Sequence, residues 1–110
     1  MSDAARVAEI LERIDRIQRA TSEGREAFFA SEVIQDAVVR NLEVIGEAAK
    51  NVTPRVRRRH PRVPWREMAR FRDLAIHHYG RVLSEEVWGM VSRELLPIRR
   101  SLSRAIPGPP

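Results

Sequence analysis

One short stretch, residues 70–80 (RFRDLAIHHYG), brings together three side chains whose chemistry suits cleavage of RNA without a metal ion. RNA carries its own nucleophile, so a catalyst must remove the 2′-hydroxyl proton, offset negative charge at phosphorus and help the 5′-oxygen to leave. An imidazole suits the proton transfers, here at His77, and a permanently charged guanidinium suits the developing charge, here at Arg72. Tyr79 can donate a hydrogen bond to the phosphate or stack on a base.

Helical geometry restricts how these groups can cooperate. Arg72 and Tyr79 face the same way, whereas His77 lies about 140° around a regular helix from Arg72. Either the helix loosens before Gly80, or two copies of the chain pool their groups across a two-fold axis. Asp73 lies one helical turn before His77 and could accept a hydrogen bond from its ring. The alternative is that these residues are ordinary surface or packing side chains.

Positive charge is concentrated around this stretch. The formal net charge is +5, and Lys50 is the only lysine, so the cations are almost all arginine. Arginine binds phosphate through a planar fork, and a local basic field attracts polyanions by releasing their counterions. We expect RNA to contact the arginines of this region, and the alternative is a solvated connector without a partner. The expected contacts are Arg55, Arg57, Arg58, Arg59, Arg62, Arg66, Arg70 and Arg81.

The apolar periodicity predicts an all-α bundle of four main helices plus a short connector helix, with no strands. We expect the main helices at residues 3–20, 25–51 and 64–80 and from Ser84 onward. The connector begins at Pro54 with Thr53 as its N-cap, and Pro97 should kink or split the last helix. Residues 1–106 form the expected single domain, and residues 107–110 form a flexible tail.

The composition argues against several other kinds of site. The chain has no cysteine, which excludes disulfides, thiolate metal sites and a thiol nucleophile. There is no HExxH spacing and no glycine-rich phosphate loop, so we expect neither a metal nor a cofactor. The N-terminus is too charged for a signal peptide, and no window approaches the roughly 18 apolar residues of a membrane span. These features predict a cytoplasmic protein that does not contact a membrane.

The arrangement Arg72-x4-His77-x-Tyr79 resembles the motif of the HEPN superfamily, specifically its HepT-like branch of toxin ribonucleases. Three further regions resemble the same branch in the same order, and together they cover nearly the whole chain. They are the second-helix signature at residues 35–52 (QDAVVRNLEVIGEAAKNV), the lead-in to the catalytic helix at residues 60–73 (HPRVPWREMARFRD), and the final helix at residues 85–88 (EEVW) and 95–97 (LLP).

This resemblance implies a HEPN bundle that forms a homodimer, with both motifs lining one cleft, and leaves open whether dimers assemble further. It also implies metal-independent RNA cleavage by the toxin of a type II toxin–antitoxin system. Arg72 and His77 would be the catalytic pair, with Asp73 as a polar helper. The partner would be an MntA-like nucleotidyltransferase antitoxin that adenylylates the motif tyrosine, here Tyr79, and so blocks the cleft.

Two residues or segments differ from the family pattern, and two alternative functions therefore remain open. Asp73 stands where this branch usually has Asn, and residues 80–83 (GRVL) lack its usual aromatic residue and Asp. One alternative is a non-catalytic HEPN module that binds a nucleotidyltransferase partner or a nucleotide. The other is a basic helical RNA-binding protein whose affinity depends on the arginines of residues 55–62 and not on His77.

Overall fold

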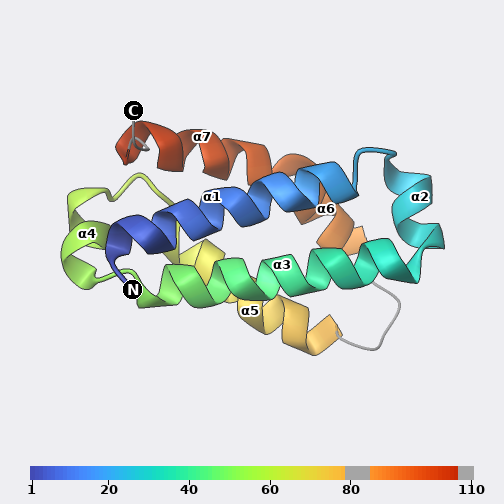
Figure 1. Cartoon of the computed structure of the whole chain (residues 1–110), viewed down its shortest axis with the longest axis horizontal. Helices are drawn as coiled ribbons and strands as arrows, with labels where there is room; N and C mark the ends of the chain where they lie inside the picture. Colours follow the sequence, from blue (N-terminus) through green and yellow to red (C-terminus); the bar gives the residue numbers. More distant parts are fainter. Residues whose placement is uncertain (79–84, 107–110) are drawn as a thin grey trace.

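The computed structural model describes residues 1–78 and 85–106, which fold into seven helices without a strand. The expected all-α bundle is therefore confirmed (Figure 1). In chain order the helices are α1 (Asp3–Ala20), α2 (Arg25–Ala30), α3 (Glu32–Asn51), α4 (Pro54–Arg59), α5 (Trp65–His78), α6 (Glu85–Arg93) and α7 (Leu95–Ala105).

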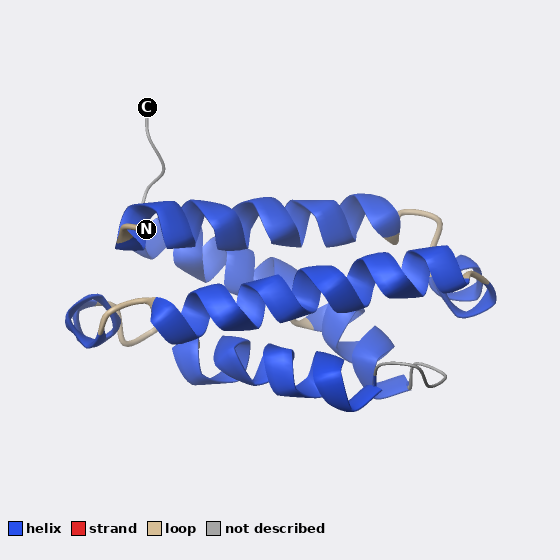
Figure 2. Ribbon diagram, turned by 60° about the horizontal axis from the view of Figure 1, so that its bottom comes forward, coloured by secondary structure: helices blue, strands red, loops and turns tan. Residues whose placement is uncertain are grey.

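Four long elements lie side by side and form the bundle. α1 and α3 run antiparallel at its centre, α5 packs along the outer side of α3, and α7 packs along the other side of α1 (Figures 1 and 2). The short helices α2 and α4 lie at opposite ends of the molecule. Among the described residues, no helix combines the length and apolar character needed to cross a membrane.

The core is built from the apolar stripes that the helical periodicity predicts. On α1, Ile10, Ile14 and Ile17 are fully buried, and on α3, Leu42 and Ile45 are fully buried. Complete burial of an aliphatic side chain of this size contributes about 1.5–3 kcal/mol, so the stripes are the main source of stability. They also fix the rotation of each helix about its axis, and therefore which side chains of α5 face solvent.

The expectation of one continuous helix over residues 25–51 is wrong, because the helix is interrupted at Ser31. Ser31 has extended backbone angles, and its hydroxyl accepts a hydrogen bond of 3.2 Å from the backbone N–H of Ile34. The side chain of Gln35 then donates to the carbonyls of Phe28 and Phe29, at 3.0 and 3.2 Å. These bonds satisfy backbone groups at the new helix ends and stabilise the break.

The last predicted helix is split into two, as expected from the proline at position 97. α6 ends at Arg93 and α7 begins at Leu95, which places Pro97 in the first turn of α7, where a helix needs no backbone N–H from it. The predicted cap at Ser84 and the predicted helix end near Gly80 fall on residues 79–84, outside the described residues.

The connector helix begins at Pro54 as expected, but Thr53 does not cap it through its side chain. The hydroxyl of Thr53 instead donates to a carboxylate oxygen of Asp3 at 2.7 Å, and its backbone N–H donates to the other oxygen at 3.0 Å. These hydrogen bonds hold the pKa of the Asp3 carboxyl below its usual value. They also join the start of α1 to the start of α4.

Candidate active site on α5

The position of Arg72 is set by an unusually close approach of two helices. α3 crosses α5 at Gly46, which is buried, and a Cβ atom on this residue would lie only 2.4 Å from the backbone nitrogen of Arg72. Such a contact is far inside van der Waals distance, so only glycine fits there without moving α5. Gly46 therefore determines how closely the backbone of Arg72 sits against α3.

The side chain of Arg72 leaves this crossing towards solvent. It is 40% exposed, and its Nε lies 3.0 Å from a carboxylate oxygen of Glu47 on α3. It borders an open hollow of about 490 Å³ whose other charged lining residues have both signs. These are Arg6, Glu9, Arg40, Glu43 and Glu47. Glu47 engages one edge of the guanidinium, which leaves other N–H groups to meet an anion.

His77 and Asp73 are both exposed on α5, but they do not share the hollow of Arg72. α5 is regular from Trp65 to His78, so it does not loosen between Arg72 and His77. The separation of about 140° around the helix axis therefore remains within one copy. Among the hydrogen bonds of the described residues, none joins Asp73 to His77. Tyr79 lies outside the described residues.

The arginines predicted to contact RNA fall into three groups. Arg55 is exposed on α4, and Arg57, Arg58 and Arg66 line an open hollow around Trp65. Arg70 lies apart from these, in a small hollow that also contains glutamates, which weakens its attraction for an anion. The glutamates are Glu67, Glu86 and Glu94. Arg81 lies outside the described residues.

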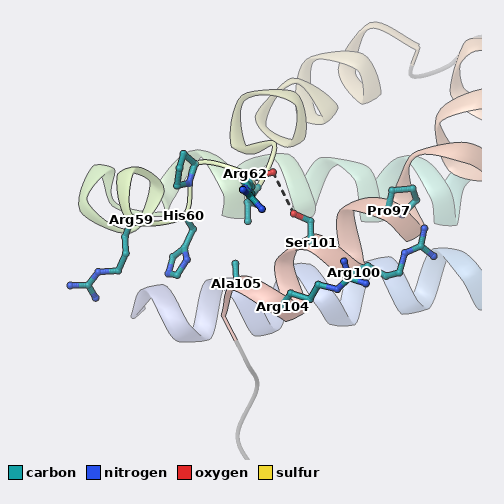
Figure 3. A pocket seen from close by; sticks show the side chains of 10 residues that line it. Arg59, His60, Arg62, Pro97, Arg100, Ser101, Arg104 and Ala105 are labelled. Carbon is teal, nitrogen blue, oxygen red and sulfur yellow. Dashed lines mark hydrogen bonds between the residues drawn. The ribbon is translucent and has the colours of Figure 1, made fainter.

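The third group, Arg59 and Arg62, borders a hollow together with Arg100 and Arg104 of α7 (Figure 3). Sequence reasoning missed Arg100 and Arg104, as it missed Glu47. The spacing of Arg100 and Arg104 by one helical turn was the available signal, since it places both on one face of α7.

The family model described as Ribonuclease HepT-like matches residues 10–105. A protein from Thermococcus cleftensis named "Probable ribonuclease HepT" is 43% identical over 89 residues, which cover 81% of this chain and 79% of the relative. A Methanocaldococcus jannaschii protein whose name contains the term RNase is 37% identical over 99 residues, covering 89% of this chain and 82% of the relative.

A second relative from Methanocaldococcus jannaschii has a name that combines gamma-glutamylcyclotransferase with RNase. It is 36% identical over 94 residues, which are 84% of this chain but only 42% of the relative. No solved structure matches the chain.

Proposed function

Because this chain belongs to the Ribonuclease HepT-like family, we propose that it is a metal-independent endoribonuclease whose catalytic pair is Arg72 and His77. The supporting observation is that α5 presents both side chains to solvent from a backbone fixed on α3 at Gly46. A rigid helix is suited to hold catalytic groups, since small displacements of such groups slow a reaction strongly.

The proposed reaction uses the 2′-hydroxyl of the RNA as nucleophile. The 2′-oxygen bonds to the adjacent phosphorus, the bond from phosphorus to the 5′-oxygen breaks, and the products end in a 2′,3′-cyclic phosphate and a 5′-hydroxyl. One imidazole removes the 2′-hydroxyl proton, and another proton must reach the departing 5′-oxygen. The guanidinium of Arg72 stabilises the negative charge that grows on the non-bridging oxygens.

A homodimer is part of this proposal, because a single regular α5 directs Arg72 and His77 to different sides. Ile76 supports such an assembly, since it is 48% exposed and adjoins His77. A two-fold contact that covers Ile76 would remove apolar surface from water and bring the two copies of His77 close together. The arginine of one copy could then act beside the histidine of the other, and the two histidines could serve as base and acid.

We further propose that the protein acts in the cell as the toxin of a type II toxin–antitoxin system. Its neutralising partner would be an MntA-like nucleotidyltransferase that adenylylates Tyr79, the motif tyrosine. An attached nucleotide would bring a phosphate to the guanidinium of Arg72 and obstruct access to His77. Co-expression with the nucleotidyltransferase should add one AMP to the peptide that contains Tyr79, measured by mass spectrometry, and Tyr79→Phe should prevent the addition.

The decisive experiment measures cleavage of RNA in EDTA by the purified wild-type chain and two variants. His77→Ala should lower the rate by at least about 10²-fold through loss of proton transfer. Arg72→Ala should lower it by about 10²–10³-fold through loss of charge stabilisation. The control is Arg16→Ala, which removes an exposed arginine of α1 and should cut at the wild-type rate. Wild-type protein that binds varied RNAs and cuts none of them would refute the proposal.

The second candidate function is the non-catalytic HEPN module, motivated by Asp73 in the place of Asn. Asp73 is exposed on α5, so its charge would meet an approaching phosphate. Expression in cells separates the two functions, because growth arrest by wild type but not by His77→Ala requires catalysis. The third candidate, a basic RNA-binding protein, predicts affinity that falls when the arginines of residues 55–62 are replaced and does not change in His77→Ala.

A further inference from the structure

Four arginines from two distant segments surround one hollow at the end of the bundle away from the C-terminal end of α5. Arg59 ends α4 and Arg62 follows it, whereas Arg100 and Arg104 belong to α7. The hollow has a volume of about 540 Å³. Figure 3 shows the side chains that line it, with the guanidinium of Arg59 at its outer edge, directed away from α7. α5 starts beside the hollow and carries the chain about 10 Å further from Trp65 to Arg72 and about 18 Å further to His77, and Arg72 borders a different hollow. The hollow is therefore separate from the candidate catalytic groups.

Among the described residues, no acidic side chain neutralises the positive charge in this hollow. No carboxylate is among the described residues that line it, and within residues 1–78 and 85–106 none of the four arginines forms a salt bridge. The neighbouring Arg99 shows the contrast, because its guanidinium pairs with Asp15 of α1 at 2.7 Å. Arg100 and Arg104 repel each other across one helical turn, and a bound anion would relieve this repulsion.

The walls of the hollow are held in place before any ligand arrives. The hydroxyl of Ser101 on α7 donates to the carbonyl of Arg62 at 3.4 Å, which joins the two walls (Figure 3). The indole N–H of Trp65 donates to the carbonyl of His60 at 3.0 Å, and Val63 between them is buried. The backbone on either side of Arg62 therefore needs little ordering on binding, which favours affinity.

We propose that this hollow is a second RNA-binding site, which holds phosphate groups of the strand whose cleavage takes place at α5. The inference rests on the proposed ribonuclease function for the identity of the polyanion. The four arginines offer guanidinium groups for phosphate oxygens, so binding here depends on the backbone and not on the base sequence. A strand that reaches both sites must extend several nucleotides beyond the cut, so the site favours long RNA over short fragments.

Binding can be tested separately from cleavage with a single-stranded RNA of about 20 nucleotides that is 2′-O-methylated throughout and so lacks the nucleophile. Arg100→Gln with Arg104→Gln should weaken binding about tenfold at low salt. The slope of log affinity against log salt should become shallower by about 1.4, because each neutralised phosphate contributes about 0.7 to the slope for a single strand. Arg59→Gln with Arg62→Gln, on the opposite wall, should have a similar effect and serves as a second test if the α7 variant folds poorly.

The matched control is Arg16→Gln with Arg19→Gln on α1, which removes the same two charges from side chains that are 48% and 67% exposed. This control should keep affinity and slope near the wild-type values. The inference would be overturned if the control lost as much affinity as the two double variants of the hollow. It would also be overturned if both of those double variants bound RNA like wild type. Cleavage gives an independent measure of the site. In the two double variants of the hollow, kcat/KM should fall for a long RNA and remain unchanged for a tetranucleotide, which is too short to reach the hollow.

The outcome also distinguishes this site from the proposed catalysis. If the wild-type chain cuts no RNA but the hollow variants still lose affinity and salt slope, the ribonuclease proposal fails and the RNA-binding site stands. If RNA is cut at the α5 motif while the hollow variants bind and cut long RNA like wild type, catalysis stands and the second site is refuted.

Discussion

At the scale of single residues, the contact between Arg72 and Glu47 is the most informative feature of the candidate site. A carboxylate 3.0 Å from Nε restricts the rotation of the guanidinium, and it also reduces the charge available to a phosphate. These two effects have opposite consequences. Restriction helps the chemical step, because the arginine is already oriented, whereas charge reduction weakens attraction of RNA before the reaction.

Glu47→Gln should separate these effects. We expect tighter RNA binding, by a few-fold at low salt, together with a cleavage rate that falls about tenfold, because the arginine is less firmly oriented. Single-turnover cleavage and binding of an uncleavable RNA measure the two quantities separately. Glu43→Gln, which changes a neighbouring carboxylate of the same hollow that pairs with Arg40, is the matched control. A rate that does not change in Glu47→Gln would show that the contact does not position Arg72.

At the scale of elements, the crossing of α3 and α5 depends on the absence of one side chain. Gly46→Ala should destabilise the fold by about 1–3 kcal/mol, because the new methyl group must push backbone atoms of α5 away. It should also lower cleavage by displacing Arg72. Gly89→Ala on α6 is the control, since its Cβ would meet only the flexible end of Arg93, and alanine favours a helix by up to about 1 kcal/mol. Equal unfolding midpoints for the two variants would contradict this account.

The contact between α1 and α7 gives a prediction about pH. Hydrogen bonds from Arg99 hold the pKa of the Asp15 carboxyl below its ordinary value of 3.8. The pair therefore stabilises the fold above about pH 4, and this contribution is lost as the pH falls below 3.8 through the lower pKa of the folded state. Both side chains are 37% exposed, so we expect at most about 1 kcal/mol.

Denaturant unfolding at several pH values checks this prediction. Asp15→Asn should be less stable than wild type at pH 7, and the difference should shrink as the pH approaches 3. Asp36→Asn, at an exposed position of α3, is the control for loss of a carboxylate and should keep the wild-type stability at pH 7. A constant difference between Asp15→Asn and wild type across the range would show that titration of the carboxyl plays no part.

At the scale of the whole molecule, the proposed dimer has a direct test. Ile76→Glu should shift the protein towards monomer and abolish cleavage together, because a charge would be buried in the contact that assembles the site. Leu96→Glu is a close control, since Leu96 is also 48% exposed but belongs to α7 and not to α5. Sedimentation measures the assembly state. An Ile76→Glu variant that stays dimeric, or a monomer that still cuts RNA, would refute the two-fold site.

Sequence reasoning succeeded where a pattern repeats along one helix. The stripe from Ile10 to Ile17 and the effect of Pro97 follow from the period of the helix and the chemistry of proline. The break at Ser31 was missed because apolar residues continue on both sides of it, and it is stabilised by side-chain hydrogen bonds of Ser31 and Gln35 that apolar periodicity does not reveal. Arg62 and Ser101 meet across 39 positions of the chain, and local spacing carries no information about such a contact.

The pair of hydrogen bonds between Asp3 and Thr53 has a practical consequence for experiments on this protein in solution. It anchors the first turn of α1, and Met1 lines the same hollow as Arg72. A purification tag joined ahead of Met1 would therefore begin close to Arg72. An acidic tag could pair with the guanidinium of Arg72, and a histidine-rich tag could take part in proton transfer in place of His77. Assays of the enzyme should therefore begin only after such a tag has been cleaved off.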